Sequence, residues 1–472
     1  MRPNILFILI DDLGWADLTC YGSSFYETPN LDRLAEQGMR FTDAYAACPV
    51  CSPTRASLMT GRYPARLSIT QFIGGHTYGR LCDVPYLHFL PHCERTIATA
   101  LRDDAGYQTW HVGKWHLGEK PFWPDQHGFE VNIGGCGWGM PKHGFFSPWQ
   151  CPTMEDGPEG QHFTDGLTDA AIKLIRERDR ERPFFLNLSH YAVHTPIQAP
   201  AELVEKYRAK AESLGLRDED ALEPGEFHPC HHKRDKPVVR RRFQCHAEYA
   251  AMIENLDTAI GRLLDELDDQ GIADNTLVVF TSDNGGLSTS EGSPTCNAPL
   301  SEGKGWMYEG GNRVCQIVRW PGVVAPGRST DEPCTSPDWY PTLLAAAGLP
   351  EHPVQHADGK SLMPLLSGEA FERGPIFWHY PHYSNQGGSP ACSVRHGDWK
   401  LIEFFEDNRR ELYNLRQDIE ENHDLSAEQP ERVERMAGQL AQWRSEVQAT
   451  VPRVNVNYTA PAAGGEADPA EV

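Results

Sequence analysis

Charged and polar side chains gather directly after four short apolar runs of this sequence. The runs span residues 5–10, 108–112, 184–188 and 277–281, and their β-branched and aromatic content is typical of buried strands. They are followed by Asp11 and Asp12, by Lys114 and His116, by His190 and His194, and by Asp283 and Asn284. Because ligands in open α/β sheets bind beyond the carboxyl ends of the strands, we expect these side chains to meet at one rim.

Four of these residues carry oxygen atoms that suit a hard cation. Asp11, Asp12, Asp283 and Asn284 offer the carboxylate and amide oxygens that Ca²⁺ and Mg²⁺ prefer. Adjacent aspartates repel each other at close quarters unless a cation lies between them. Taken singly, an Asp-Asp pair is typical of a helix cap and Asp-Asn-Gly-Gly of a plain turn. Their shared position at strand ends of one predicted sheet favours a metal site.

A cysteine in a short polar motif is the candidate nucleophile. Cys51 precedes residues 57–60, which look helical, and Pro53 suits the start of that helix. Cys51 would then face a helix N-terminus, where partial positive charge favours anions. The alternative is a buried cysteine before a helix, and for a lone cysteine that interpretation is usually correct.

Apolar runs and helical patterns alternate along the first three quarters of the chain. A further strand is expected at 316–319, and helices are expected at 31–37, 96–104, 165–176, 247–269 and 338–347. The helix at 247–269 carries the clearest periodicity. The alternation predicts an α/β fold with a large, mostly parallel mixed sheet flanked by helices. Residues 216–246 interrupt it with Pro, His and basic residues, and we interpret them as a surface insertion.

A smaller unit is expected after the large one. Short strands at 376–380, 392–395, 399–403 and 411–414 and a helix at 429–447 predict a C-terminal α+β subdomain with a short antiparallel sheet. We therefore divide the chain into a catalytic domain at 1–368, this subdomain at 369–450, and a loosely ordered tail at 451–472 that is rich in Ala, Gly and Pro.

Composition excludes several classes of partner. The chain has 472 residues and a net charge of −23, so it is a poor general binder of nucleic acid or of anionic membranes. No stretch approaches the ~20 apolar residues that span a bilayer. The apolar run at 5–10 is too short for a leader. We expect a cytoplasmic protein as the chain stands, or a periplasmic or secreted one if a leader was removed. The 13 cysteines lack zinc-like pairs, and most should be buried thiols, although spacing leaves one or two disulfides open.

The cysteine motif carries a resemblance to a known family. Cys51-Ser52-Pro53-Thr54-Arg55, followed by Ser57-Leu58-Met59-Thr60-Gly61-Arg62, resembles the signature of the type I sulfatases of the alkaline phosphatase superfamily. Further blocks resemble the family in the same order: Asp11-Asp12-Leu13-Gly14, Gly113-Lys114-Trp115-His116-Leu117-Gly118, His194-Thr195-Pro196, Ser282-Asp283-Asn284-Gly285, Gly303-Lys304-Gly305 and Tyr308-Glu309-Gly310-Gly311. They run from residue 4 to about residue 322, and the C-terminal unit also fits.

The resemblance implies a modified nucleophile. In that family a separate formylglycine-generating enzyme oxidises the motif cysteine, here Cys51, to formylglycine. The aldehyde is hydrated to a geminal diol, and one hydroxyl attacks sulfur, releases the alcohol and leaves a covalent sulfate ester. The other hydroxyl then loses its proton and expels sulfate. The modified Cys51 would join Asp11, Asp12, Asp283 and Asn284 around the cation.

The resemblance also assigns roles to five other residues. Arg55 would stabilise negative charge beside the diol and the metal. Lys114 and Lys304 would bind sulfate oxygens, although a lone lysine is more often a solvated surface residue. His116 would accept the proton of the second hydroxyl, and His194 would protonate the leaving alcohol as general acid. We interpret His190 as a structural residue.

Weaker features concern the surroundings of the site. Residues 228–246 hold Cys230, His231, His232, Cys245 and His246, whose spacing fits no common zinc pattern. The basic run at 233–242 is interpreted as a solvated loop, with a rim that attracts a polyanionic glycan as the alternative. Aromatic and histidine side chains that could stack on a sugar or border the pocket are Trp138, His143, Trp149, His379, His382 and Tyr383.

We therefore predict a sulfuric ester hydrolase that removes sulfate from a carbohydrate, with Ca²⁺ as the metal and Mg²⁺ as its alternative. The resemblance is greatest to bacterial polysaccharide and aryl sulfatases. A phosphonate or phosphodiester hydrolase of the same superfamily is the nearest alternative. A non-catalytic binder of sulfated glycans is the alternative from another class; loss of Cys51, Arg55, Lys114 or His194 would be its sign, and all four are present.

Overall fold

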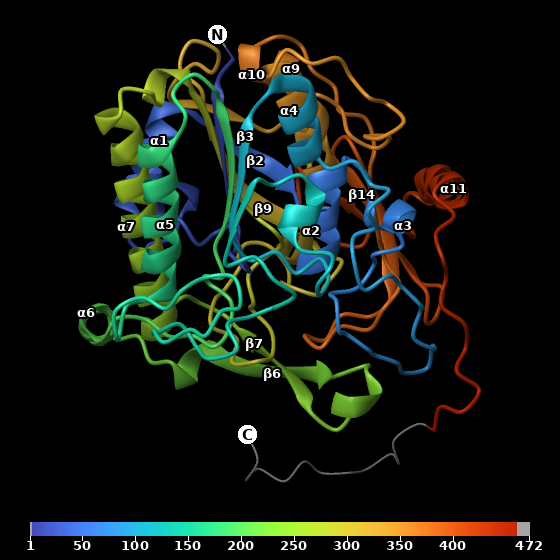
Figure 1. Cartoon of the computed structure of the whole chain (residues 1–472). Coiled ribbons are helices and arrows are strands. Elements are labelled where there is room, and N and C mark those ends of the chain that lie inside the picture. The colour runs from blue at the N-terminus through green and yellow to red at the C-terminus, as the bar shows by residue number, and fades with distance from the viewer. Residues whose placement is uncertain (1, 460–472) are drawn as a thin grey trace.

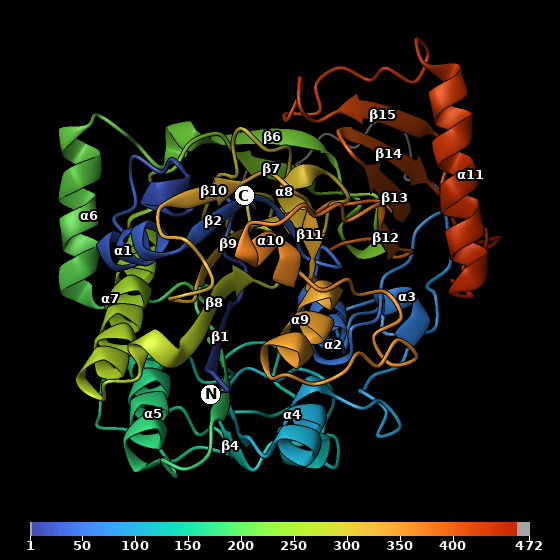
Figure 2. The same ribbon diagram turned by 90° about the horizontal axis from the view of Figure 1, so that it is seen from above.

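The computed structural model describes residues 2–459 and has a large central sheet covered by helices on both faces (Figures 1 and 2). The strand order is β10-β2-β9-β8-β1-β5-β3-β4, and β11 pairs with β2 outside this path. The strands are β1 (Asn4–Ile10), β2 (Met39–Tyr45), β3 (Gln108–Gly113), β4 (Val131–Ile133), β5 (Phe184–Ser189), β8 (Thr276–Ser282), β9 (Arg313–Arg319), β10 (Arg328–Thr330) and β11 (Cys334–Thr335). Among them β9 runs antiparallel to both neighbours, so the predicted mostly parallel sheet is confirmed.

Side chains of the central strand β1 alternate between two apolar layers. Leu6, Ile8 and Ile10 pack into one cluster, and the intervening residues Ile5, Phe7 and Leu9 pack into the other. This alternation follows from the two-residue period of a strand. Because both faces are covered, β1 reads as a continuous apolar run, as is usual for a parallel strand in an α/β protein.

Two groups of helices supply these layers (Figure 2). One face is covered by α1 (Pro29–Gln37), α5 (Phe163–Glu177) and α7 (Ala247–Asp269), and α6 (Ala201–Ser213) packs on α7. The other face is covered by α2 (Cys51–Thr60), α4 (Ile97–Ala105), α9 (Trp339–Ala346) and α10 (Met363–Ser367). The long helix α7 has the bounds expected from its periodicity.

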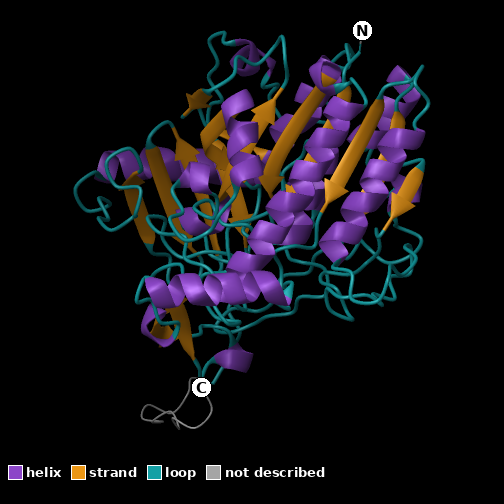
Figure 3. Cartoon of the chain, turned by 90° about the vertical axis from the view of Figure 1, so that its left-hand side faces the viewer, coloured by secondary structure: helices purple, strands orange, loops and turns teal. Residues whose placement is uncertain are grey.

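The C-terminal part forms a second sheet beside the first (Figure 2). Figure 3 views the molecule from the side of α5 and α7, where helices lie over strands of the large sheet. The strands of the second sheet, β12 (Ile376–Tyr380), β13 (Ala391–His396), β14 (Trp399–Phe404) and β15 (Arg410–Asn414), pair antiparallel in chain order. Helix α11 (Pro430–Glu446) covers one face of this sheet, where Trp443 stacks on Phe377 with ring centroids 4.9 Å apart.

The sequence interpretation missed β2 and α6. Cys51 is the first residue of α2, and Pro53 lies in the first turn, where proline is tolerated, in agreement with the helix start expected near Pro53. Strand β2 carries Asp43, which breaks a clean apolar pattern and is neutralised by Arg313 and Arg395 from distant segments.

Four further features of the structure bear on what the sequence led us to expect. The 216–246 insertion forms a hairpin of β6 (Leu222–Phe227) and β7 (Pro237–Arg241). Of the tail, residues 460–472 lie outside the described residues, and Val454 makes an antiparallel bridge with Leu81. All 13 cysteines are free, and most are buried. No helix within residues 2–459 has the length and apolar character to cross a membrane.

Candidate active site

Strand register brings the predicted residues to one rim of the large sheet. Ile10 of β1 pairs with Ser282 of β8, so Asp11 and Asp283 leave the sheet side by side. Gly113 of β3 likewise pairs with Ser189 of β5, which carries Lys114 and the segment containing His194 to the same edge. The carboxyl ends of four parallel strands therefore deliver the side chains that the sequence analysis placed there.

The acidic residues form a buried cluster. Asp11, Asp12, Asp283 and Asn284 are each at most 1% exposed. Asn284 Nδ2 donates to Asp12 Oδ1 at 2.8 Å, and the backbone amide of Asp12 donates to Asp283 Oδ1 at 3.3 Å. Asp12 has a φ of 62°, an uncommon backbone conformation for a residue other than glycine. Asp11, Asp12 and His194 each offer a ligand atom, and these atoms lie within 4.8 Å of one another.

Buried cations surround this cluster. Lys114 Nζ lies 2.6 Å from Asp11 Oδ2, and both side chains are fully buried. Arg55 donates from Nε to Asp283 Oδ2 at 2.8 Å and from Nη1 to the Lys114 carbonyl at 2.9 Å. Burial raises the pKa of the Asp11 carboxyl well above its usual range, although Lys114 opposes that shift. Lys114 and Arg55 therefore offset only part of the cost of burying the Asp11 carboxylate.

A chain of contacts joins Asp12, Lys304 and His194. Lys304 Nζ lies 2.7 Å from Asp12 Oδ2 and 3.0 Å from His194 Nε2. Burial would raise the pKa of Asp12, but the ammonium of Lys304 holds it below its usual range. Burial and the ammonium of Lys304 lower the pKa of His194 to about 3. His194 is therefore a neutral imidazole in this arrangement, with Nδ1 near the Thr195 carbonyl.

Cys51 lies at the start of α2 and faces His116. Its Sγ is 3.3 Å from His116 Nδ1, and the Nε2 of that ring lies 3.2 Å from the Ile73 carbonyl. Burial raises the pKa of the Cys51 thiol, against the attraction of Lys114 and Lys304. An unmodified Cys51 is therefore a protonated thiol and a weak nucleophile.

These side chains form the floor of a cavity of about 560 Å³. The floor consists of Cys51, His116, His194 and Lys304. The walls come from five segments and consist of Phe72, Ile73, Gly74, Gly137, Trp138, Gly139, Met140, Lys142, Thr195, Glu291, Asn385 and Gln386. The cavity thus opens from a polar, cationic floor to a mixed aromatic and polar mouth, an arrangement that suits a ligand with an anionic end.

The structure sorts the pocket residues suggested by the sequence. Trp138 lines the cavity, and the ring of His143 lies 6.0 Å from it, centroid to centroid. Trp149 is 1% exposed and stacks on Phe163, so its suggested contact with substrate is wrong. His379, His382 and Tyr383 also lie outside the lining, because His379 packs under the chain near Thr450 and the others contact the 70–83 loop.

The charged side chains of the 228–246 segment contact other parts of the protein. Within the described residues its cysteines and histidines form no metal-binding cluster of three or more groups. Several of its basic side chains pair with carboxylates: Arg240 with Glu302, Arg241 with Asp218, and Arg242 with Glu223. His190, by contrast, is fully buried away from the cavity lining, in keeping with a structural role.

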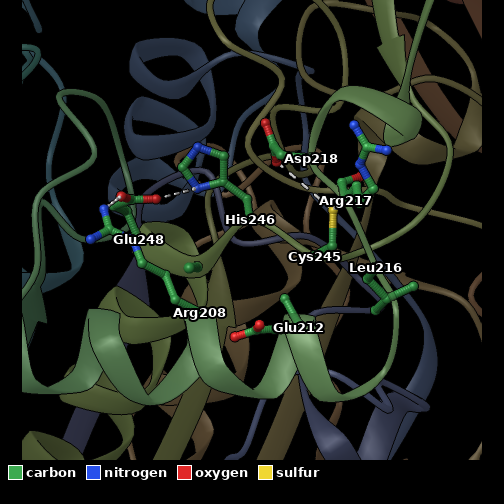
Figure 4. A pocket seen from close by; sticks show the side chains of 10 residues that line it. Arg208, Glu212, Leu216, Arg217, Asp218, Cys245, His246 and Glu248 are labelled. Carbon is green, nitrogen blue, oxygen red and sulfur yellow. Dashed lines mark hydrogen bonds and ion pairs between the residues drawn. The ribbon is translucent and has the colours of Figure 1, made fainter.

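A second cavity of about 410 Å³ lies between α6 and the start of α7 (Figure 4). Several of its ionic side chains pair with other protein groups: Arg208 and His246 contact Glu248, and Arg217 contacts Glu219. This cavity contains none of the motif residues, so we assign the chemistry to the larger one.

The sequence reasoning identified the wall that contains Trp138, but it missed Phe72, Glu291 and Gln386 on the other walls. They lie in loops with no periodic pattern and come together only through tertiary contacts. Glu291 has an unusual local backbone conformation, because Ser290, Glu291 and Ser293 have positive φ values. Such values cannot be read from residue type.

Comparison with known proteins agrees with this geometry. The Sulfatase family model matches residues 3–349, and the model described as N-sulphoglucosamine sulphohydrolase, C-terminal, matches residues 302–448. A sulfatase of Formosa agariphila is 33% identical, over 91% of this chain and 85% of that protein. The N-acetylgalactosamine-6-sulfatase of Homo sapiens is also 33% identical, over 80% of this chain and 68% of that protein.

Solved structures extend the similarity to the whole fold. The structure of Ps i-CgsB in complex with k-i-k-neocarrahexaose is 29% identical and has a TM-score of 0.76, over 97% of this chain and 96% of that chain. The family model, the relatives and the fold agree with the motifs at the strand ends. This chain therefore belongs to the sulfatase family and is a sulfuric ester hydrolase.

Proposed function

We propose that this enzyme removes sulfate from sulfated carbohydrates with formylglycine, formed from Cys51, as its nucleophile. One observation carries the proposal: Cys51 lies on the cavity floor at the start of α2, 3.3 Å from His116, where burial leaves its own thiol unreactive. Formylglycine at this position would supply a hydrated aldehyde whose hydroxyl attacks sulfur. The carbohydrate part is supported by relatives whose names refer to sulfated sugars.

The acidic cluster fits a divalent cation. Asp11 Oδ1 and Asn284 Oδ1 are buried acceptors without a hydrogen-bond partner among residues 2–459, which is unfavourable unless a cation contacts them. We propose that Asp11, Asp12, Asp283 and Asn284 hold Ca²⁺, because all four offer oxygen ligands. A bound cation would polarise a sulfate oxygen and favour ionisation of the attacking hydroxyl.

The remaining residues of the cavity floor and the acidic cluster would bind sulfate, stabilise charge or transfer protons. Lys114 and Lys304 would hold sulfate oxygens as cationic donors, and Arg55 would stabilise charge beside Asp283. His116 would accept a proton from the residue at position 51, whose side chain its Nδ1 faces. The negative charge of a bound sulfate would raise the low pKa of His194, and the protonated ring would then donate a proton to the leaving oxygen.

Peptide mass spectrometry tests the nucleophile. The peptide containing both Cys48 and Cys51 is isolated from active enzyme and treated with a thiol-alkylating reagent. We expect alkylation at Cys48 and an aldehyde at Cys51; Cys48 is a buried thiol in the same peptide and serves as the internal control. An unmodified Cys51 thiol in fully active enzyme would refute the mechanism.

Metal content and thermal unfolding test the cation independently of activity. We expect calcium in elemental analysis of the purified protein, and an increase in stability of about 2.7 kcal/mol at a Ca²⁺ concentration 100 times the Kd. Asp283→Asn should lower the affinity, whereas Asp265→Asn, at a solvent-exposed position on α7, should not. Equal calcium responses in the two variants would contradict the ligand assignment.

A further inference from the structure

The mouth of the active-site cavity has two chemically different walls. One wall is the segment from Gly137 to Lys142, which presents the Trp138 ring and the side chain of Met140. The other presents Glu291 and Gln386, from segments far apart in the sequence. The cationic floor accounts for a sulfate group, but it does not account for an acidic residue at the mouth. Glu291 therefore calls for a separate explanation.

The backbone around Glu291 is held in an unusual conformation. Ser290, Glu291 and Ser293 have φ values of 57°, 49° and 40°, and Gly292 between them has a φ of 89°. Consecutive left-handed residues other than glycine are costly and persist where surrounding contacts hold them in place. Such conformations cluster at binding and catalytic sites.

The hairpin of the 216–246 insertion provides those contacts. The Ser290 amide donates to the Val239 carbonyl at 2.8 Å, and Ser293 Oγ donates to the same carbonyl at 2.9 Å. Ser290 Oγ lies 2.9 Å from His228 Nε2. The insertion therefore supports the loop that carries Glu291 and is more than a solvated excursion.

A second set of contacts orients the Glu291 side chain. Gln386 is 4% exposed, and its Oε1 accepts a hydrogen bond from Ser384 Oγ at 2.7 Å. Its Nε2 then donates to Glu291 Oε2 at 2.7 Å. Lys233 Nζ lies 3.7 Å from Glu291 Oε1 and donates to the Asn385 carbonyl at 2.8 Å. The carboxylate is thus fixed on the cavity wall by a buried amide.

The fixed carboxylate keeps acceptor capacity for a ligand. An ionised carboxylate accepts about four hydrogen bonds and donates none. Its side chain is 33% exposed, and Gln386 uses one of those acceptor positions. Sugar hydroxyl groups are neutral donors that match such an acceptor, whereas a second sulfate or a uronate would be repelled.

We propose that Glu291 is a specificity-determining residue that accepts hydrogen bonds from free hydroxyl groups on the sugar ring that bears the sulfate. This inference rests on the proposed action on sulfated carbohydrates. It predicts a preference for rings with one sulfate and free hydroxyl groups over rings with a further anionic group on the Glu291 side of the cavity.

Steady-state kinetics on three substrates test the proposal. The substrates are a monosulfated hexosamine found by a desulfation screen, its analogue lacking one ring hydroxyl, and an aryl sulfate, which has no ring hydroxyls. For Glu291→Gln we expect the ratio of kcat/KM on the sugar to kcat/KM on the aryl sulfate to fall about 10- to 100-fold. The deoxy analogue tests the hydroxyl group directly. If the removed hydroxyl is the one that Glu291 binds, wild-type kcat/KM should be lower on the deoxy analogue than on the parent sugar by a similar factor. Glu291→Gln should then lower kcat/KM on the deoxy analogue little further.

Controls separate recognition from structure. Glu428→Gln makes the same change at an exposed site before α11 and should leave the ratio as in wild type. Glu291→Asp keeps the charge and should retain part of the preference. Thermal unfolding of each variant reports any loss of fold; a purely structural Glu291 would lower both kcat/KM values together.

The outcomes distinguish this inference from the proposed function. A wild-type enzyme that cleaves the sugar sulfate, with an unchanged ratio in Glu291→Gln, would overturn the role of Glu291 alone. A wild-type enzyme that cleaves the aryl sulfate but no sugar sulfate would overturn the carbohydrate proposal and this inference with it.

Discussion

Replacement of His194 by alanine should slow the enzyme in proportion to how poor the leaving group is. His194 Nε2 lies 3.0 Å from Lys304 Nζ and 3.6 Å from Asp12 Oδ2, on the cavity floor. General acid catalysis contributes about 10²- to 10⁴-fold. We expect a loss of that size in kcat/KM on an alkyl or sugar sulfate, whose alkoxide leaves poorly without a proton.

An aryl sulfate with a nitrophenol leaving group needs little protonation, so His194→Ala should lower kcat/KM on this substrate by less than about tenfold. The sulfate contacts should survive the substitution, because Lys304 also contacts Asp12, at 2.7 Å, and does not depend on His194 alone for its position. The assay is the dependence of kcat/KM on leaving-group pKa across a series of aryl and alkyl sulfates, for wild type and His194→Ala.

Lys114→Met provides the contrast. It removes a cation that contacts Asp11 and is expected to bind sulfate oxygens common to every substrate, so the loss in kcat/KM should be the same for all leaving groups. His190→Gln changes a buried histidine of the same segment that lies outside the cavity lining, and should not alter the slope. A uniform loss across leaving groups in His194→Ala would refute the assignment of His194 as the acid.

Three further predictions concern stability and the nucleophile. The Lys400 ammonium lies 2.9 Å from each of two buried carboxylates, those of Glu309 and Glu421. Lys400→Met removes this cation, so we expect the free energy of unfolding in urea to fall by about 3–5 kcal/mol. A loss below about 1 kcal/mol would contradict this. Burial lowers the pKa of His379 from 6.5 to about 4 in the folded protein. Between these pH values the unfolded state binds a proton at this histidine, and the folded state does not. Stability present above pH 6.5 should therefore fall by about 3 kcal/mol as the pH drops to 4, and His379→Gln should flatten that part of the profile. Cys51→Ala should abolish sulfate release while thermal unfolding stays cooperative; residual turnover near wild type would exclude Cys51 as the nucleophile.

Parts of this fold were predictable because they depend on local patterns. Helix α7 has the bounds that its apolar spacing predicts, since a 23-residue amphipathic segment leaves few alternatives. Strands β1, β5 and β8 were found because they are buried on both faces and therefore read as continuous apolar runs. Strand β2 was missed because its charged residue Asp43 is neutralised only by arginines from distant segments.

The sequence by itself determined which residues reach the rim of the sheet. Asp11, Lys114 and Asp283 each follow a strand directly, and parallel strands end at the same edge. The tertiary structure alone decided the contact between Lys304 and His194 and the pairing of Glu291 with Gln386. Lys304 and His194 are 110 positions apart in the sequence, and Glu291 and Gln386 are 95 positions apart; all four lie in loops without periodicity. Their proximity depends on how packed layers and an inserted hairpin place those loops, which no local pattern encodes.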